Sequence, residues 1–480
     1  MKKIAAVILL LGCLLVNFAA CKNGSTTPSS GTDTKPSTEN QDPFSDVDLG
    51  KEEITLLCMK ESGAGGSQID SYNELFAEQN GDVINDAIFL RYAAMQDSLN
   101  CVLNIRSVGD KSTLGTILRD YNMSGESANI SAALLVGKSL PAVISTGDLV
   151  DLNSVSSVDL SNDWWIRSGV SDMTIAGKCY AAPGNASVYG LTSMACVYFN
   201  KDVMSDNRVE ENLYDTVRNY QWTLEKMAKL SADLTAELDG NEGISISDRV
   251  GFVAEYGYLS YMFTSTGGRT VEIGSDKKVT MTVGGQATSD FIDAFLTLFN
   301  NNEVTKVPVR DYDDDYTEVA KHFMNQQVVF YAHYVFDALD LRGMEGEFGL
   351  LPTPMANEDQ HAYYAGVNRW LSSYTVIPSG CVNIEKAGII AEALNYYGKQ
   401  YIREAIYTKS FESGRSVRDE DSIEMFNLIV EAQVHDPGLL LTDTVYSLFS
   451  SVASLGTNTF ASSIKKREQA FVLEMESIIK

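Results

Sequence analysis

Short apolar stretches alternate with longer amphipathic ones along the first half of the chain. Apolar residues run together at 54–59, 101–108 and 141–145, and each run predicts a buried strand. Between the first two runs, residues 83–99 predict a helix. Strands that alternate with helices are typical of α/β layers built around parallel strands.

The second half is richer in helical periodicity. Apolar residues recur three and four positions apart in 224–238, 291–299 and 387–397, which predicts three helices with one apolar face each. Thr223 stands directly before the first of them, where its hydroxyl can accept a backbone N–H bond and cap the helix. Two short apolar runs, at 328–331 and 349–352, predict further strands.

The chain begins with the pattern of a secretory signal peptide. Two lysines precede the apolar run Ile4–Val16, and small residues stand directly before Cys21. The run is shorter than the roughly 20 apolar residues that a membrane-spanning helix needs. A cysteine in this place resembles the bacterial lipobox, which implies cleavage before Cys21 and a lipid anchor on its thiol. Cys13 is the alternative anchor.

Residues 22–42 carry no aliphatic or aromatic side chain apart from prolines and are rich in Ser, Thr, Gly and Asn. Such a segment cannot bury enough apolar surface to offset the entropy lost on ordering. Residues 21–50 are therefore expected to be the lipid anchor and a flexible tether. This arrangement predicts a protein that works beside a membrane without crossing it.

The composition of the chain argues against several classes of function. The 64 acidic and 37 basic residues give a net charge of −27, which argues against binding to nucleic acid or broad docking on anionic lipid. The five cysteines beyond Cys21 form no CxxC pair and read as small buried hydrophobes. No P-loop, GxSxG or HExxH pattern is present, so an enzyme is not expected.

Several segments in order resemble extracellular solute-binding proteins related to maltose-binding protein. The segments are Tyr198–Asp202, Gln221–Lys226, His322–Phe330, Gly346–Pro354 and Val376–Pro378, with Gln326 at a usual glycine place. Three more resemble a clostridial lipoprotein subgroup of that family: Gly81–Ala87 with Arg91, Asp159–Trp165 and Ala176–Tyr180. The matches extend from residue 52 to about residue 400.

The resemblance implies an α/β, two-lobe periplasmic-binding-protein-like fold of type II, with the ligand cleft between the lobes and crossovers at a hinge. Its expected boundaries are 1–20 for the signal peptide, 21–50 for anchor and tether, 51–187 plus 323–370 for lobe one, and 188–322 plus 371–480 for lobe two. It also implies a monomer on the outer face of the cytoplasmic membrane, held by its lipid alone. The partners that the resemblance implies are a small polar ligand, a carbohydrate in this family, and the permease subunits of an ABC importer, without cofactor or metal.

A sugar site needs aromatic platforms for the C–H faces and polar side chains for the hydroxyls. The expected ligand-binding aromatic residues are Trp165, Tyr189, Tyr334, Phe336 and Trp370. The expected polar ones are Glu61, Ser145, Asp148, His333, Asn368 and Arg369. Core packing is the competing interpretation for each aromatic residue, and a structural hydrogen bond or salt bridge for His333 and Arg369. Trp222 is assigned to packing, because the resembled motif places it at a helix start.

Other interpretations stay open at this point. The same fold could bind a peptide, a polyamine or a phosphorylated polyol, or the chain could capture surface glycans without a transporter. The loop Asp239–Gly243 begins like a calcium loop but lacks the later acidic ligands, and Asp311–Asp315 is an acidic run of the kind usually solvated.

Overall fold

The computed structural model describes residues 42–60, 68–245, 247–300, 316–412 and 420–480. The chain divides into the units Met1–Pro43 and Phe44–Lys480, and the fold described here is that of the second. Phe44 is already buried in it, against the rings of Tyr396 and Tyr397. Several features predicted from the sequence lie outside the described residues: the signal peptide 1–20 with Cys13, the anchor Cys21, most of the tether, Glu61 and Asp311–Asp315.

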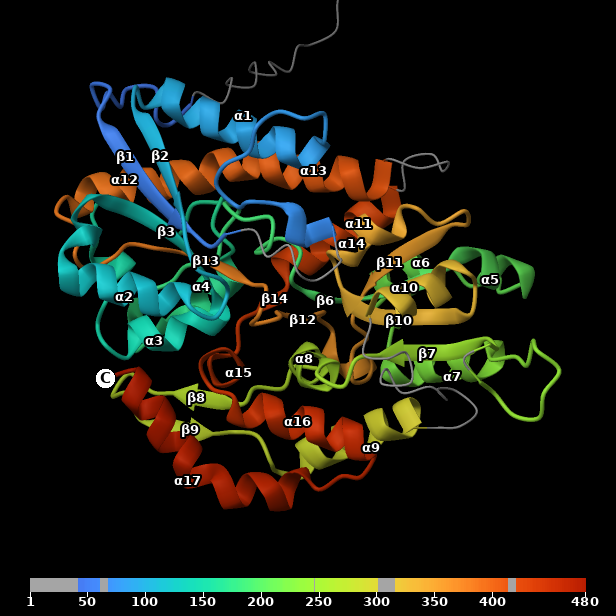
Figure 1. The fold of residues 1–480 in the computed structure, drawn as a ribbon. Coiled ribbons are helices and arrows are strands. Elements are labelled where there is room, and N and C mark those ends of the chain that lie inside the picture. Colours follow the sequence, from blue (N-terminus) through green and yellow to red (C-terminus); the bar gives the residue numbers. More distant parts are fainter. Residues whose placement is uncertain (1–41, 61–67, 246, 301–315, 413–419) are drawn as a thin grey trace, which may run out of the picture. The chain divides into compact units, whose positions relative to one another are not determined.

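The first sheet has the strand order β13-β3-β1-β2 (Figure 1). Its strands are β1 (Glu53–Cys58), β2 (Val102–Ser107), β3 (Ile130–Val136) and β13 (Ser373–Val376). β1 is parallel to β2 and β3, and β13 is antiparallel to β3. Every residue of β3 is buried, as expected for a strand covered on both faces.

Helices pack on this sheet with capped N-termini. In α1 (Val83–Ser98), the Asp82 side chain accepts hydrogen bonds from two backbone N–H groups of the first turn. α12 (Ile384–Gly398) is capped in the same way by Asn383, and it contacts both α1 and β3. The sheet with these helices is called the first lobe.

One predicted strand is wrong. Residues 141–145 lie in the helix α3 (Leu140–Ile144), with Pro141 in the first turn, where the missing N–H leaves no hydrogen bond unmade. α3 packs on α2 (Leu114–Ser124). The third strand of the sheet is β3, which sequence reasoning missed because its serine and two alanines are weak strand formers.

The second sheet has the order β11-β6-β10-β7 and defines the second lobe. Its strands are β6 (Ala195–Asn200), β7 (Val250–Ala254), β10 (Val328–Tyr334) and β11 (Phe348–Pro352). β10 runs antiparallel to β6 and parallel to β7, and β11 runs antiparallel to β6. Trp222 is buried and its Nε1 donates to the carbonyl of Pro352 over 2.9 Å, which confirms its packing role.

Two segments lie in the opposite lobe from the one expected. β10 and β11 were expected in lobe one, but their hydrogen-bonded register places them beside β6 in the second sheet. β13 and α12 were expected in lobe two, but β13 pairs with β3 and α12 packs on it. The chain therefore crosses between lobes before residue 373 rather than at 323.

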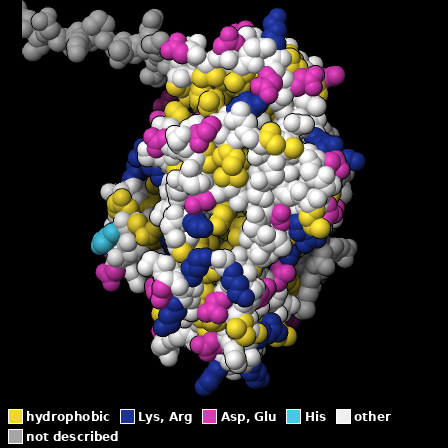
Figure 2. Space-filling view, turned by 90° about the vertical axis from the view of Figure 1, so that its left-hand side faces the viewer, with side chains coloured by type: hydrophobic (Ala, Val, Ile, Leu, Met, Phe, Trp, Pro, Cys, Tyr) yellow, Lys and Arg dark blue, Asp and Glu magenta, His cyan; other side chains and the backbone are white. Residues whose placement is uncertain are grey.

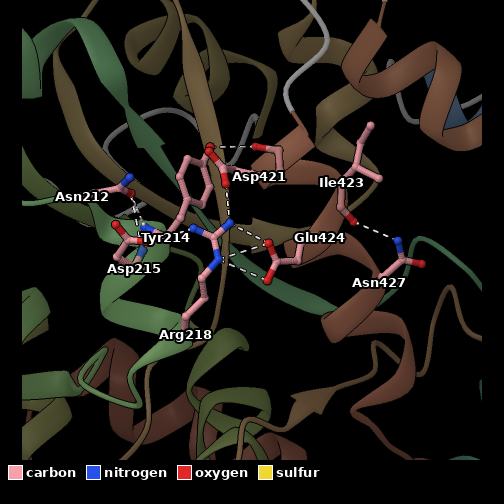
Figure 3. Close-up of polar contacts among 9 residues, drawn as sticks. Asn212, Tyr214, Asp215, Arg218, Asp421, Ile423, Glu424 and Asn427 are labelled. Atoms are coloured by element: carbon pink, nitrogen blue, oxygen red, sulfur yellow. Dashed lines mark hydrogen bonds and ion pairs between the residues drawn. The ribbon is translucent and has the colours of Figure 1, made fainter.

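The chain returns to the second lobe at α14 (Glu420–Glu431), which packs on β11. Figure 3 shows how α6 (Leu213–Arg218) holds it: Arg218 lies between its own helix and Glu424, with N···O distances down to 2.5 Å. These charges are half exposed and contribute little stability. The buried hydroxyls of Tyr214 and Ser422, 2.8 Å apart, and the apolar residues of α14 supply the firmer contact.

The remaining elements complete the two lobes. Thr223 caps α7 by accepting from the N–H of Lys226, and the three helices predicted from periodicity are present as α7, α9 and α12. The other helices are η1 (Gln68–Ser71), α4 (Arg167–Met173), α5 (Lys201–Asp206), α7 (Leu224–Leu234), α8 (Tyr258–Ser265), α9 (Gln286–Asn300), α10 (Tyr316–Met324), α11 (Asp337–Leu341), α13 (Glu404–Tyr407), α15 (Pro437–Leu441), α16 (Thr444–Leu455) and α17 (Phe460–Ile478). The short strands are β4 (Thr174–Ile175), β5 (Lys178–Cys179), β8 (Val271–Ile273), β9 (Val279–Met281), β12 (Ala365–Gly366) and β14 (Gln433–Val434).

Charges of both signs are mixed on the face of the molecule that Figure 2 shows. On the face in Figure 2, acidic and basic side chains are intermingled rather than gathered into one patch. Cys58, Cys101, Cys179, Cys196 and Cys381 are all buried free thiols, as predicted. None of the described helices combines the length and the hydropathy needed to cross a bilayer.

Two of the segments that cross between the lobes lie side by side. Residues 182–194 and 367–375 run antiparallel, with bridges between Ala182 and Thr375 and between Met194 and Val367. The amide of Asn368 adds a hydrogen bond of 2.9 Å to the carbonyl of Ser193. The two crossings therefore form one hydrogen-bonded ribbon.

A buried carboxylate fastens this ribbon to the first lobe. Glu74 accepts hydrogen bonds from Ser187 on the first crossing and, over 3.2 Å, from Ser373 on the second. Arg91 of α1, also buried, donates to the backbone carbonyls of Glu74 and Ala186. Burial raises the pKa of Glu74 to about 7, against the hydrogen bonds from the two serines and the charge of Arg91, which lower it.

The raised pKa predicts a pH-dependent stability. The native state holds the Glu74 proton more tightly than the unfolded chain, whose glutamate pKa is near 4.5, so the free energy of unfolding should fall as pH rises from 4.5 to about 7. Over this whole pH range, the free energy of unfolding should fall by about 3 kcal/mol. Urea unfolding of the wild type and of Glu74→Gln across this range should show the decline only in the wild type. Glu385→Gln, which removes an exposed carboxylate of lowered pKa, serves as control and should keep the decline; an equal slope in Glu74→Gln would contradict the assignment.

Candidate functional site

A cavity of about 610 Å³ opens beside the paired crossings. Its walls come from η1 and the loop before α2 in the first lobe, from α10, α11, α16 and the ends of β7 and β10 in the second, and from the second crossing. The lining residues are Ile69, Asp70, Lys111, Glu255, Ala320, Lys321, Met324, His333, Tyr334, Phe336, Asp337, Asp340, Asn368, Trp370, Leu371 and Tyr446. Its size suits a small ligand, and its lining joins aromatic rings to a few polar groups.

The end of β10 supplies the inner wall. Strand residues alternate between faces, but the chain turns into α11 directly after Tyr334, so His333, Tyr334 and Phe336 all line the cavity. His333 Nδ1 is hydrogen-bonded to the carboxylate of Asp337, one helical turn further on, and both side chains are buried. Burial works to lower the pKa of His333, but the charges of Asp337 and Glu255 outweigh it and raise the pKa above its ordinary value.

Aromatic rings surround a second carboxylate at the end of β7. Glu255 accepts a hydrogen bond from the hydroxyl of Tyr334. The Tyr334 ring stacks on Phe336 at 5.7 Å between centroids and meets the edge of Tyr261 at the same distance. Tyr446 of α16 packs against Tyr261 at 6.1 Å. These contacts fix the rings around Glu255.

The second crossing contributes a tryptophan platform. Asn368 Oδ1 accepts a hydrogen bond of 2.9 Å from the backbone N–H of Trp370, which sets the local turn. Lys138 Nζ lies 4.6 Å from the centroid of the Trp370 ring. The same ammonium group pairs with Asp443 at 2.7 Å, so a charged contact between the lobes holds this ring.

The structure brings together five of the residues predicted to bind ligand: His333, Tyr334, Phe336, Asn368 and Trp370 all line the cavity. The neighbouring Arg369 points elsewhere. Its guanidinium is buried and donates to the carboxylate of Asp443 over 2.7 Å and to the carbonyl of Thr442. Arg369 therefore forms a structural salt bridge, which was the competing interpretation of this residue, and does not line the cavity.

The other predicted residues stand apart from the described lining. Trp165 is buried in a separate core of the first lobe, where its Nε1 donates to Glu392 over 3.0 Å. Tyr189 is buried on the first crossing. Ser145 is exposed and bonds a carbonyl of its own helix, and Asp148 accepts from Asn122 at 3.0 Å.

Sequence reasoning missed seven polar or aromatic residues of the lining: Asp70, Lys111, Glu255, Lys321, Asp337, Asp340 and Tyr446. Asp337 stands four residues after His333, a spacing at which two helical side chains meet, and this could have indicated it. Glu255 follows a strand that had not been predicted. For the other five, nothing local in the sequence indicates that they meet the crossing.

The calcium-like loop uses its carboxylates internally. Asp239 accepts from the backbone N–H of Asn241 at 2.8 Å, and Asp248 accepts from three backbone N–H groups of the loop. Within the described part of the chain, no three His, Cys, Asp or Glu side chains are grouped as metal ligands would be.

Neither protein-family models nor curated proteins match this sequence, but solved structures match the fold. An ABC substrate-binding protein from Listeria monocytogenes in complex with cycloalternan is 13% identical, with a TM-score of 0.56 over 88% of this chain and 99% of that one. The galacto-N-biose- and lacto-N-biose I-binding protein of an ABC transporter from Bifidobacterium longum is 13% identical, with a TM-score of 0.58 over 89% and 98%. The sugar-binding protein MalE from Xanthomonas citri is 11% identical, with a TM-score of 0.58 over 88% and 97%.

The coverage of each neighbour is nearly complete, so the likeness extends over both lobes. The α/β, two-lobe periplasmic-binding-protein-like fold predicted from the sequence is confirmed.

Proposed function

We propose that this protein is the substrate-binding lipoprotein of an ABC importer and that it captures a carbohydrate by lobe closure. The observation that carries the proposal is the cavity at the crossings, where the rings of Tyr334, Phe336 and Trp370 lie among carboxylate, amide and ammonium groups. Ring faces suit the C–H faces of a sugar and the polar groups suit its hydroxyls. The solved neighbours whose names state a sugar ligand support the same class.

The position of the cavity supports closure as the mechanism. Its walls come from both lobes and from a crossing between them, so a bound ligand would contact all three parts. A ligand favours the closed form only by its differential affinity for it, and contacts to both lobes supply that difference.

The net charge of the cavity lining distinguishes between the classes of ligand that the sequence left open. The lining holds four carboxylates, of Asp70, Glu255, Asp337 and Asp340, and two lysines. A phosphorylated polyol would therefore meet net repulsion. A peptide, a polyamine, and glycan capture without a transporter remain as outcomes of the first experiment.

The first experiment is a thermal-shift screen of neutral and amine-bearing saccharides, polyamines, peptides and phosphorylated polyols. A true ligand at a hundredfold excess over Kd should stabilise the fold by about 2.7 kcal/mol. Small-angle scattering with the same ligand should show a smaller radius of gyration, because the lobes close. Stabilisation by no saccharide, or scattering curves unchanged at saturation, would contradict the proposal.

Trp370 tests the site itself. Trp370→Ala should weaken saccharide binding well beyond tenfold, because the indole face is lost as a platform. Trp165→Ala is the matched control: it removes a buried indole outside the cavity and should cost about 3–5 kcal/mol of stability with affinity of the folded fraction kept. Calorimetric titration and urea unfolding of both variants separate the two roles. Normal affinity in Trp370→Ala would remove this residue from the site.

The proposed anchor has its own test. Cys21→Ala should abolish lipid modification and release the chain from membranes, because the thioether would carry the acyl chains. Mass spectrometry of the N-terminal peptide from the wild type measures this directly. An acylated Cys13 would move the anchor, and an unmodified N-terminus would overturn it.

A further inference from the structure

Two carboxylates that line the cavity, those of Asp70 and Glu255, form no ion pair with a described lysine or arginine. Asp70 of η1 is 9% exposed and lines the cavity, and it makes no hydrogen bond or ion pair with any other residue that the structure describes. A carboxylate with this little exposure loses part of its hydration, and no described group bonds to the Asp70 side chain in compensation. A group that supplies positive charge or donors from the cavity would relieve this cost.

The second carboxylate, Glu255, lines the same cavity from the second lobe, whereas Asp70 lines it from the first. Its one hydrogen bond from a described side chain comes from the neutral hydroxyl of Tyr334, and no described lysine or arginine pairs with it. The rings of Tyr334 and Tyr446 lie around it, linked through Tyr261 at 5.7 and 6.1 Å. Burial, and after it the charge of Glu255, raise the pKa of both hydroxyls, so they stay neutral.

A carboxylate among aromatic faces is a combination that favours an ammonium group. The ring quadrupole attracts a cation, and the carboxylate adds a charge-assisted hydrogen bond. The buried imidazole of His333 interacts with this charge, but its hydrogen bond goes to Asp337 and not to Glu255. A neutral hydroxyl could donate a hydrogen bond to the carboxylate. It would lack the electrostatic attraction that the ring faces exert on a cation.

We infer that the ligand carries a protonated amine, held between Asp70 and Glu255, and that it is an amine-bearing saccharide. This inference rests on the proposed function for the saccharide part and on the two carboxylates for the amine. It makes Glu255 the residue that sets specificity between amine-bearing and neutral sugars.

Three matched disaccharides that differ only at the second carbon of each ring test the inference: cellobiose with a hydroxyl, the glucosamine disaccharide with an amine, and diacetylchitobiose with an acetamide. Titration calorimetry with the full mature chain at about pH 6 should show the amine form binding at least tenfold tighter than the other two, as one charge-assisted contact predicts. Glu255→Gln should cancel that preference by weakening the amine form more than cellobiose, and Asp70→Asn should weaken the amine form in the same direction.

Glu272→Gln, an exposed carboxylate on β8 outside the cavity, is the matched control and should change nothing. Thermal unfolding of each variant establishes that it is folded. If Glu255→Gln weakens the neutral and amine forms equally, the carboxylate is a hydroxyl acceptor and the inference fails while the proposed function stands. Tighter binding of either neutral form by the wild type overturns the inference too. If the protein binds polyamines but no saccharide, the proposed function is contradicted, and only the recognition of an amine is supported.

Discussion

The ribbon made by the two neighbouring crossings fixes the relation between the lobes. Bridges at Ala182–Thr375 and Met194–Val367 join the two segments to each other. Other backbone groups of the second segment bond to the first lobe, where Ser373–Val376 pair with β3. Glu74 reaches both crossings from the first lobe, and Arg91 holds the backbone beside it. Since the carboxylate is buried, loss of any of these partners would leave a polar group without hydrogen bonds. The ribbon can bend only where its residues leave this network.

The cavity follows from where the strands end. β7 and β10 are parallel, so Glu255 and the end of β10 emerge at the same edge of the second sheet. The crossing that carries Asn368 and Trp370 passes that edge because it must reach β13 in the first sheet. The side chains that line the cavity are thus brought together by topology, although more than a hundred residues separate Glu255 from Trp370.

Local patterns predicted the strands β1, β2, β10 and β11 and the helices α1, α7, α9 and α12, and five of the residues predicted to bind ligand line the cavity. The neighbours His333, Tyr334 and Phe336 could be recognised because they end or directly follow a strongly apolar strand. The strand β3 was missed since its alanines carry little β propensity, and with it the order of the first sheet. The lobe boundaries near 323 and 370 depend on pairing between distant strands, which no local pattern encodes. Trp165 and Arg369 have the composition of site residues but are occupied by Glu392 and Asp443.

The contact between Lys138 and Trp370 has a consequence for how a chain of sugar rings could enter. With the ammonium group 4.6 Å from the ring centroid, one face of the indole is covered and only the other can receive a pyranose. The Lys138–Asp443 pair joins the two lobes, so the contact that closes one side of the indole depends on how the lobes are placed. Opening the lobes far enough to part this pair would free both faces of Trp370, and closing them would leave the proposed saccharide one side on which to stack.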